Sequence, residues 1–189
     1  MNKVEAQHSD IERVLLDDGV IQTRVRELGA QLTRDYEGKD LVMVGILKGS
    51  VIFLADLMKC VDLDFSIDFM SASSYANESS TGEVRLMLDL RESIQGKDVV
   101  IVEDIVDTGL TLKYLQENLR TREPKSLEIC TILDKPDCRK VPVTPKYSGF
   151  KIPNEFVVGY GLDYNEYYRS LPYIGVLKPE AADRRKKIS

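Results

Sequence analysis

The chain has 189 residues, of which 43% are hydrophobic and 30% are charged, and its net charge is -5. This size and composition are typical of one globular domain that buries its own core, and they exclude a chain that needs disulfides or a structural metal in order to fold. The negative charge argues against nucleic acid as a partner, and no apolar run approaches the roughly 20 residues of a membrane helix.

Helical and strand patterns alternate along the chain. Apolar residues at three- and four-residue intervals predict helices, whereas continuous or alternating apolar runs of strand length predict strands. In chain order we expect a helix over 18–36, a strand over 41–47, a helix over 51–60, strands over 63–70, 85–90 and 99–102, a helix over 112–119 and a strand over 127–133. The alternation predicts an α/β fold, with a mainly parallel, twisted sheet flanked by helices and with ligands at the carboxyl ends of the strands.

Residues 71–84 have neither periodicity nor apolar content, although they connect two predicted strands. Loops of this length are usually functional lids or disordered segments, and an insertion without a role is the alternative interpretation. Residues 181–189 have the composition of a charged terminal tail. We therefore expect a single domain over 1–189 with a flexible lid loop at about 71–84.

The cysteines are odd in number and lack the Cys-x-x-Cys spacing of zinc or redox sites. The N-terminus does not show the basic residues followed by an apolar stretch that mark a signal peptide. Both features predict a reduced, cytoplasmic protein without a membrane partner.

The segment 99–112 carries the most chemical information. An apolar run ends at Glu103 and Asp104, and the sequence Asp-Thr-Gly-Leu-Thr then leads into a predicted helix. The first N–H groups of a helix lack intrahelical partners and attract phosphate. Acids beside a phosphate repel it unless ribose hydroxyls or a divalent cation intervene, so Glu103 and Asp104 suggest one of these. The tripeptide Asp-Thr-Gly taken alone is a common loop, and the prediction rests on the whole ordered segment.

Two later segments extend this pattern. Residues 133–136 read Leu-Asp-Lys-Pro, and 156–169 read Phe-Val-Val-Gly-Tyr-Gly-Leu-Asp-Tyr-Asn-Glu-Tyr-Tyr-Arg. The segment 99–112 closely resembles the phosphoribosyl-pyrophosphate (PRPP) signature of type I phosphoribosyltransferases, and the two later segments resemble the purine-binding hood of their 6-oxopurine members. Together with 45–50 and 73–75, they resemble the bacterial hypoxanthine phosphoribosyltransferase family from about residue 16 to residue 177.

The resemblance implies a type I phosphoribosyltransferase fold with a small hood, formed by the N-terminal segment and about 135–189. It implies a purine salvage enzyme that transfers the 5-phosphoribosyl group from PRPP to hypoxanthine or guanine, giving IMP or GMP and pyrophosphate with Mg²⁺. It also implies a homodimer or homotetramer whose other partners are these small molecules.

For PRPP, the resemblance assigns three loops and an arginine. Lys48 and Gly49 would form the pyrophosphate loop, with a cis peptide bond between them. Arg169 would hold the pyrophosphate by its guanidinium fork, and Ser74 and Tyr75 would belong to the lid that excludes water. The 5-phosphate would be cradled by Asp107, Thr108, Gly109, Leu110 and Thr111.

For the purine and the metal, the resemblance assigns acids and a lysine. Asp107 would act as the general base beside the purine N7. Glu103 and Asp104 would bind the ribose hydroxyls, directly or through magnesium, and Asp163 would reach magnesium from the pyrophosphate side. The purine-binding residues would be Lys135, which donates to the 6-oxygen, Phe156, which stacks on the base, Val157, through its backbone, and Asp163.

Two alternatives stay open at this point. A regulatory protein could bind PRPP or nucleotides through the same fold without catalysis, although it would not need Asp107, Lys135 and a lid. Another phosphoribosyltransferase could act on adenine, xanthine or a pyrimidine. A 6-amino purine would face Lys135 with a second donor and leave a polar group unpaired, which disfavours adenine. The sequence does not rank hypoxanthine, guanine and xanthine.

Overall fold

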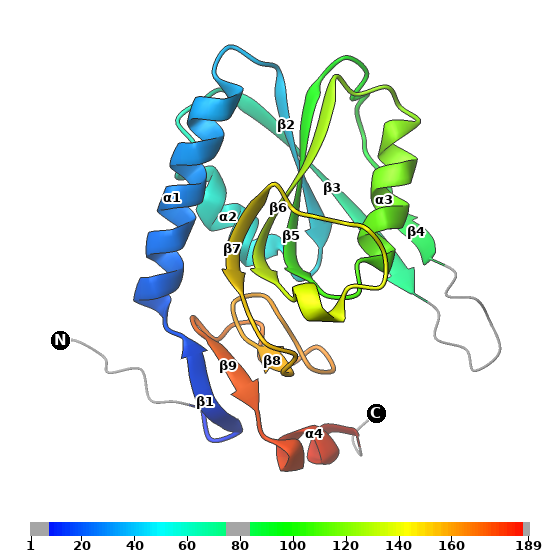
Figure 1. Ribbon diagram of the computed structural model, residues 1–189. Coiled ribbons are helices and arrows are strands. Elements are labelled where there is room, and N and C mark those ends of the chain that lie inside the picture. Colours follow the sequence, from blue (N-terminus) through cyan, green and yellow to red (C-terminus); the bar gives the residue numbers. More distant parts are fainter. Residues whose placement is uncertain (1–7, 75–83, 187–189) are drawn as a thin grey trace.

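The computed structural model describes residues 8–74 and 84–186 and places them in two sheets and four α-helices (Figure 1). The strands are β1 (Ile11–Leu16), β2 (Leu41–Leu47), β3 (Phe65–Ser74), β4 (Val84–Leu88), β5 (Asp98–Val106), β6 (Ser126–Asp134), β7 (Tyr147–Lys151), β8 (Val157–Val158) and β9 (Ile174–Leu177). The helices are α1 (Asp18–Tyr36), α2 (Val51–Met58), α3 (Leu110–Arg120) and α4 (Pro179–Lys186), with a short 3-10 helix η1 (Pro136–Cys138).

The larger sheet has the strand order β4-β3-β2-β5-β6-β7, and all neighbouring strands in it are parallel except β3 and β4. Strand β2 pairs with both β3 and β5, and its residues from Leu41 to Ile46 are buried. A parallel strand covered on both faces needs apolar side chains throughout, which is why this strand reads as one continuous apolar run. The predicted α/β fold with a mainly parallel sheet is confirmed.

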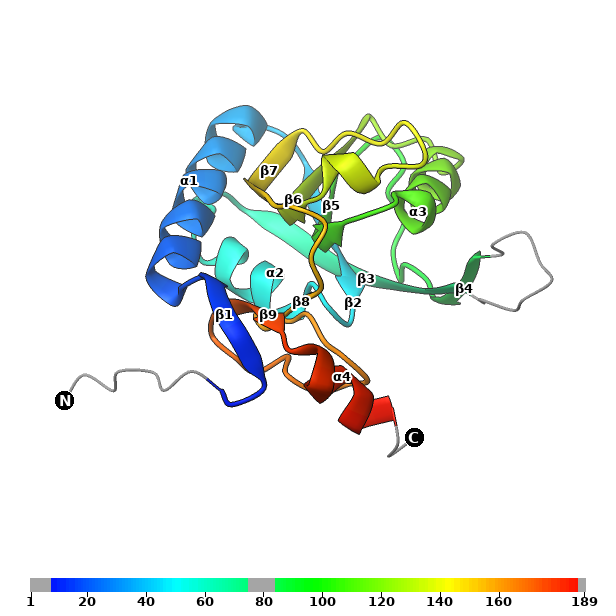
Figure 2. The same ribbon diagram turned by 60° about the horizontal axis from the view of Figure 1, so that its bottom comes forward.

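Helices α1 and α2 cover one face of the larger sheet, and α3 covers the other (Figures 1 and 2). Successive side chains of β2 alternate between the two cores: Met43 packs with α1 and α2, whereas Val42 and Val44 pack with α3. Helix α1 begins at a cap, because the carboxylate of Asp17 accepts a hydrogen bond from the Val20 N–H at 3.0 Å.

Several predicted boundaries shift in the structure. Strand β5 does not end at residue 102 but runs to Val106, so Glu103 and Asp104 lie inside the strand rather than in a loop. The reason is that pairing with β6 continues until Val106 lies opposite Asp134. Helix α2 ends at Met58, two residues before the predicted end. The predicted charged tail is helical as far as Lys186, the last residue of α4.

Strands β3 and β4 form an antiparallel pair whose last partners are Ser74 and Val84. The predicted lid, at about 71–84, therefore begins and ends in paired strands. Its central residues, 75–83, lie outside the described residues, and so does Tyr75.

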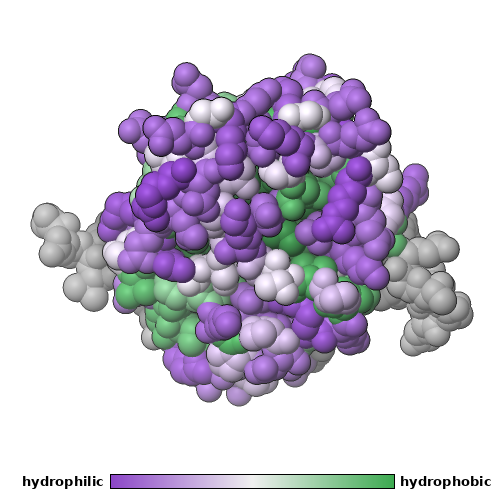
Figure 3. All heavy atoms as spheres, turned by 45° about the horizontal axis from the view of Figure 1, so that its top comes forward, coloured by the Kyte–Doolittle hydropathy of each residue, from purple (hydrophilic) through white to green (hydrophobic). Residues whose placement is uncertain are grey.

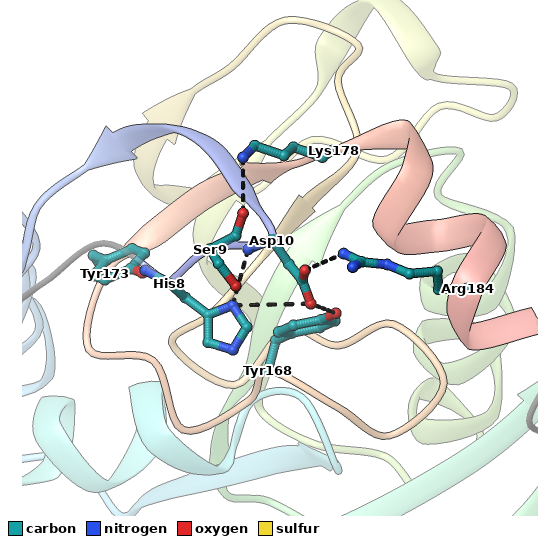
Figure 4. Close-up of polar contacts among 7 residues, drawn as sticks. All are labelled: His8, Ser9, Asp10, Tyr168, Tyr173, Lys178 and Arg184. Atoms are coloured by element: carbon teal, nitrogen blue, oxygen red, sulfur yellow. Dashed lines mark hydrogen bonds and ion pairs between the residues drawn. The ribbon is translucent and has the colours of Figure 1, made fainter.

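The smaller sheet, in the order β1-β9-β8, lies beyond the carboxyl ends of the larger sheet together with α4 (Figures 1 and 2). Segments near the two ends of the described chain meet at Asp10, whose carboxylate accepts a hydrogen bond from the Tyr168 hydroxyl at 2.8 Å and pairs with Arg184 of α4 (Figure 4). The Lys178 ammonium donates to the Ser9 carbonyl at 2.8 Å. These contacts fix β1 against the segment that precedes Arg169.

The two sheets described leave the opposite end of the larger sheet without a covering sheet, as far as residues 8–74 and 84–186 show. Figure 3 looks obliquely onto this end, where β2, β5 and β6 begin, and its surface is mostly hydrophilic with smaller hydrophobic areas between the polar residues. Among the described residues, no helix combines the length and the apolar character needed to cross a membrane.

Helix α1 packs closely against the turn that follows α2, and this contact can be tested at Gly29. An added Cβ at Gly29 would lie 2.5 Å from the Cβ and the carbonyl oxygen of Cys60. Glycine to alanine normally stabilises a helix interior by about 1 kcal/mol, but here the clash should dominate. We expect Gly29→Ala to destabilise the fold by about 1–3 kcal/mol, measured by denaturant unfolding. Ala30→Ser, at the exposed neighbouring position, is the control; a Gly29→Ala protein at least as stable as wild type would contradict this packing.

Candidate functional site

Parallel pairing brings the carboxyl ends of β2, β5 and β6 to the same edge of the larger sheet, which faces the smaller sheet. A cavity of about 220 Å³ opens there. Its lining combines the ends of β2 and β5 with the beginning of α3: Ile46, Leu47, Ala72, Glu103, Ile105, Val106, Asp107, Thr108, Gly109, Thr111 and Leu112. Glu103 of the predicted acid pair and most of the predicted phosphate loop therefore share one cavity, whereas Asp104 does not line it.

The predicted pyrophosphate loop follows β2 directly. The cis peptide bond joins Leu47 to Lys48, not Lys48 to Gly49, so the predicted position is wrong by one residue. The ladder of β2 ends at Leu47, opposite Ser71, and the chain turns at that point. The Lys48 ammonium is exposed and lies 3.1 Å from the Glu166 carboxylate.

Gly49 lies directly against Asp104, one member of the acid pair. A Cβ at Gly49 would be 1.7 Å from Oδ2 of Asp104, and a Cβ at Gly161 would be 2.0 Å from the Gly49 carbonyl oxygen. Gly161 has a φ of +99°, in the region that favours glycine. The loop after β2, the end of β5 and the hood segment thus touch one another through two glycines.

The acid pair occupies adjacent positions of β5, and Asp104 is only 8% exposed. Burial raises the pKa of Glu103 well above its ordinary value of 4.5, and the neighbouring charge of Asp104 raises it further. Burial also raises the pKa of Asp104, while its hydrogen bonds and the Arg169 charge act in the opposite direction. The charged forms of both acids are therefore unfavourable here, and a bound cation would favour them.

The predicted phosphate loop leads into α3. Gly109 precedes the helix with a φ of +80°, and the Leu110 N–H lies 3.5 Å from the Thr108 hydroxyl oxygen. Helix α3 begins at Leu110, so Leu110 and Thr111 provide N–H groups of its first turn, which lack acceptors within the helix. The structure places Thr108, Gly109, Leu110 and Thr111 as an anion-binding loop requires.

A lysine and an acid face each other beside this loop. Lys135 follows β6, its residue is 6% exposed, and its ammonium lies 3.9 Å from Oδ2 of Asp107. The same ammonium donates to the carbonyl oxygen of Glu155 at 2.8 Å. Since an ammonium has three hydrogens, Lys135 keeps donors for a further acceptor.

The hood contributes an exposed aromatic ring. Phe156 is 54% exposed, and its ring meets the edge of Tyr164 at a centroid distance of 5.4 Å. Val157 is buried in β8, where it pairs with Val176. Such a large exposed apolar side chain next to a buried strand offers a face on which a planar ligand can stack.

Arg169 and Asp163 also lie on the hood. The Arg169 guanidinium lies 2.9 Å from Asp163 and 3.3 Å from Glu166, and it donates to the Gly161 carbonyl at 2.8 Å. Asp163 also accepts from the Glu166 N–H at 2.8 Å. The paired acids hold the guanidinium in place at the edge of the site.

The three predicted metal-binding acids occupy two places, with Glu103 and Asp104 on β5 and Asp163 on the hood. Within residues 8–74 and 84–186, no three His, Cys, Asp or Glu side chains gather as a metal-binding group.

Of the residues at the site that were not predicted, Gly161 and Arg139 make the contacts that bear most on its geometry. Gly161 lies in the quoted hood segment, where two glycines two residues apart were a usable signal. Arg139 donates to the Asp107 carbonyl and pairs with Asp134. Its only sequence signal is a basic residue four positions after Lys135, which is not specific.

Comparison with known proteins places this arrangement in a family. The family model of the phosphoribosyl transferase domain matches residues 15–165. The chain therefore belongs to the phosphoribosyltransferase family, and the family predicted from its motifs is confirmed.

Individual relatives show which members of the phosphoribosyltransferase family this chain is similar to. The chain is 59% identical to the hypoxanthine-guanine phosphoribosyltransferase of Staphylococcus aureus over 174 residues, which are 92% of this chain and 97% of that protein. A crystal structure of a hypoxanthine phosphoribosyltransferase from S. aureus has a TM-score of 0.90 at 57% identity, with 95% of this chain and 98% of that chain covered. A lysine-to-arginine mutant of the Trypanosoma cruzi hypoxanthine phosphoribosyltransferase, solved in complex with the product IMP, has a TM-score of 0.89 at 41% identity, with 96% of this chain and 97% of that chain covered. The predicted purine salvage enzyme is confirmed, and nothing in these relatives supports the regulatory alternative.

The raised pKa of Glu103 predicts a pH-dependent stability. A carboxyl group whose pKa is higher in the folded state ionises unfavourably there, so wild-type stability falls as the pH rises above about 4.5, the ordinary value. Without Mg²⁺ and PRPP, Glu103→Gln should therefore unfold at a temperature higher by a few degrees at pH 7 and should match wild type near pH 4. Thermal unfolding from pH 4 to 8 measures this difference. Glu12→Gln, at an exposed position of β1, is the control; a difference independent of pH would contradict the assignment.

Proposed function

We propose that this chain transfers the 5-phosphoribosyl group from PRPP to hypoxanthine or guanine through the residues of this cavity and the hood. Thr108, Gly109, Leu110 and Thr111 hold the 5-phosphate, and the acid pair on β5 holds the ribose. Lys48, Gly49 and Arg169 bind the pyrophosphate. Lys135, Phe156 and Val157 bind the purine.

The pairing of Lys135 with Asp107 carries this proposal. The 6-oxygen and N7 of a 6-oxopurine lie on the same edge of the ring system, where one accepts a hydrogen bond and the other carries or gives up a proton. The ammonium and the carboxylate lie 3.9 Å apart, close enough to meet these neighbouring groups of one base. Phe156 lies on the hood with its ring exposed for stacking.

The charges around the cavity suit a dissociative transfer. As the bond from C1 of the ribose to pyrophosphate breaks, positive charge develops on the ribose and negative charge on the leaving group. Arg169 and the loop at Lys48 stabilise the leaving group, while the acid pair faces the sugar. Asp107 holds or removes the N7 proton, which makes the purine a better nucleophile toward C1.

Magnesium fits the donor set because Glu103 and Asp104 are adjacent carboxylates whose burial disfavours their charge in the absence of a cation. When bound, the ion neutralises charge on the pyrophosphate and the ribose site. Asp163 would contribute from the hood side, where Arg169 already orients it.

The remaining parts of the proposal concern the surroundings of the reaction. A lid at about 71–84, including Ser74 and Tyr75, would keep water away from the ribose cation. The family resemblance supports a homodimer or homotetramer, which light scattering would measure. The spacing of the cysteines supports a cytoplasmic location.

The substrate is tested by mixing the purified chain with PRPP, Mg²⁺ and each of hypoxanthine, guanine, xanthine and adenine. We expect nucleotide and pyrophosphate from hypoxanthine or guanine, and little from adenine, because its 6-amino group would face the Lys135 donor. Absence of product with every 6-oxopurine would contradict the proposed reaction. Adenine as the best substrate would contradict the role of Lys135.

The role of Asp107 is tested by Asp107→Ala. Loss of a general base should lower kcat by roughly 10²- to 10⁴-fold, whereas the Kd for PRPP should change much less. Asp137→Ala removes an acid from the exposed surface of η1 and is the matched control. Equal losses in turnover and PRPP affinity would assign Asp107 to binding alone.

A further inference from the structure

We propose that Arg139 is a positioning residue that aims the backbone N–H groups of the phosphate loop at the 5-phosphate. This inference rests on the proposed role of that loop. Arg139 belongs to the segment 135–141, which follows β6 and passes along the loop on the side away from the cavity lining. Nothing in the sequence pattern assigns it a role.

The segment 135–141 binds three successive carbonyl groups of the loop. The Val106 carbonyl accepts from the Lys135 N–H at 2.9 Å, and the Thr108 carbonyl accepts from the Lys140 N–H at 3.0 Å. Between them, the Asp107 carbonyl accepts from the Arg139 guanidinium at 2.5 Å. Arg139 is thus the side chain that completes a series of contacts otherwise made by the backbone.

The orientation of these carbonyls decides where the N–H groups point. In a planar trans peptide, the C=O of one residue and the N–H of the next point in opposite directions. Holding the Asp107 carbonyl therefore directs the Thr108 N–H away from Arg139, and holding the Thr108 carbonyl does the same for the Gly109 N–H. Both N–H groups belong to the loop that would receive a phosphate.

A second acceptor fixes the guanidinium itself. Its other terminal nitrogen pairs with the carboxylate of Asp134, a residue that is 5% exposed. Arginine can satisfy a carboxylate and a carbonyl at once because its donors lie in a rigid planar fork, which the single ammonium of lysine does not offer. The pair is buried, so removing Arg139 alone leaves Asp134 without its cation.

Gly109, the glycine of the phosphate loop, also lies against Arg139. Built on Gly109, a Cβ would lie 3.1 Å from Cδ of Arg139 and 3.2 Å from a methyl carbon of Val141. The arginine stem therefore packs against the turn whose φ of +80° begins α3. Its head orients the peptide before this turn, and its stem supports the turn from behind.

The test compares ligands that differ only in the 5-phosphate. For the full chain with Mg²⁺, the Kd values of IMP and inosine are measured by titration calorimetry or by competition for wild type and Arg139→Met. We expect the Kd of IMP to rise at least tenfold and that of inosine to change less than twofold. Lys140→Met removes the same charge from the exposed neighbouring residue and should leave both values unchanged.

A structural role alone would give a different result. If Arg139 only balanced the charge of Asp134, then the double variant Asp134→Asn, Arg139→Met would recover both stability and wild-type affinity for IMP. We expect the double variant to recover stability but not affinity for IMP. The test therefore remains decisive even if Arg139→Met alone does not fold. Recovered IMP affinity, an equal loss for IMP and inosine, or an Arg139→Met protein that matches Lys140→Met would each overturn the proposal. Failure of the wild-type chain to form IMP would instead refute the proposed function.

Discussion

The site depends on one close contact, in which the backbone of Gly49 lies against the carboxylate of Asp104. No side chain fits between them, since a Cβ at Gly49 would fall 1.7 Å from the carboxylate oxygen. The contact is available because β2 and β5 are parallel neighbours whose carboxyl ends share an edge. Gly161 adds the hood by packing on the Gly49 carbonyl. The loop after β2, the end of β5 and the hood segment would bind the two ends of PRPP and the purine. Their relative positions therefore depend on two contacts at which only glycine fits.

The electrostatics of the site depends on its two adjacent acids and on two cationic side chains. Burial raises the pKa values of Glu103 and Asp104, which makes their charge unfavourable until a cation or hydroxyl-bearing ligand arrives. The cationic side chains of Lys135 and Arg169 lie beside two other acids, Asp107 and Asp163. In the proposed function the buried acids would face the ribose, Arg169 would face the pyrophosphate and Lys135 would face the purine.

The segment after β6 links recognition of the base to recognition of the phosphate. Lys135 donates from its side chain toward the purine side and from its backbone to the loop of Asp107, while Arg139 holds the same loop a few residues later. In the proposed function, a short segment anchored at the buried Asp134 would thus set the geometry of both the purine site and the phosphate site. The terminal contacts around Asp10 act comparably on the hood, because they fix Tyr168, which immediately precedes Arg169 (Figure 4).

The sequence by itself determined the α/β class, the family, and nearly every residue with a proposed chemical role, because those properties depend on local periodicity and on ordered motifs. Helix α1 and strand β2 have their predicted bounds for the same reason. Tertiary structure decided what depends on pairing: β5 extends through the acid pair because β6 remains beside it, and residues 179–186 form α4, where Arg184 meets Asp10. It alone revealed Arg139, since a hydrogen bond to a backbone carbonyl 32 residues away leaves no periodic trace in the sequence.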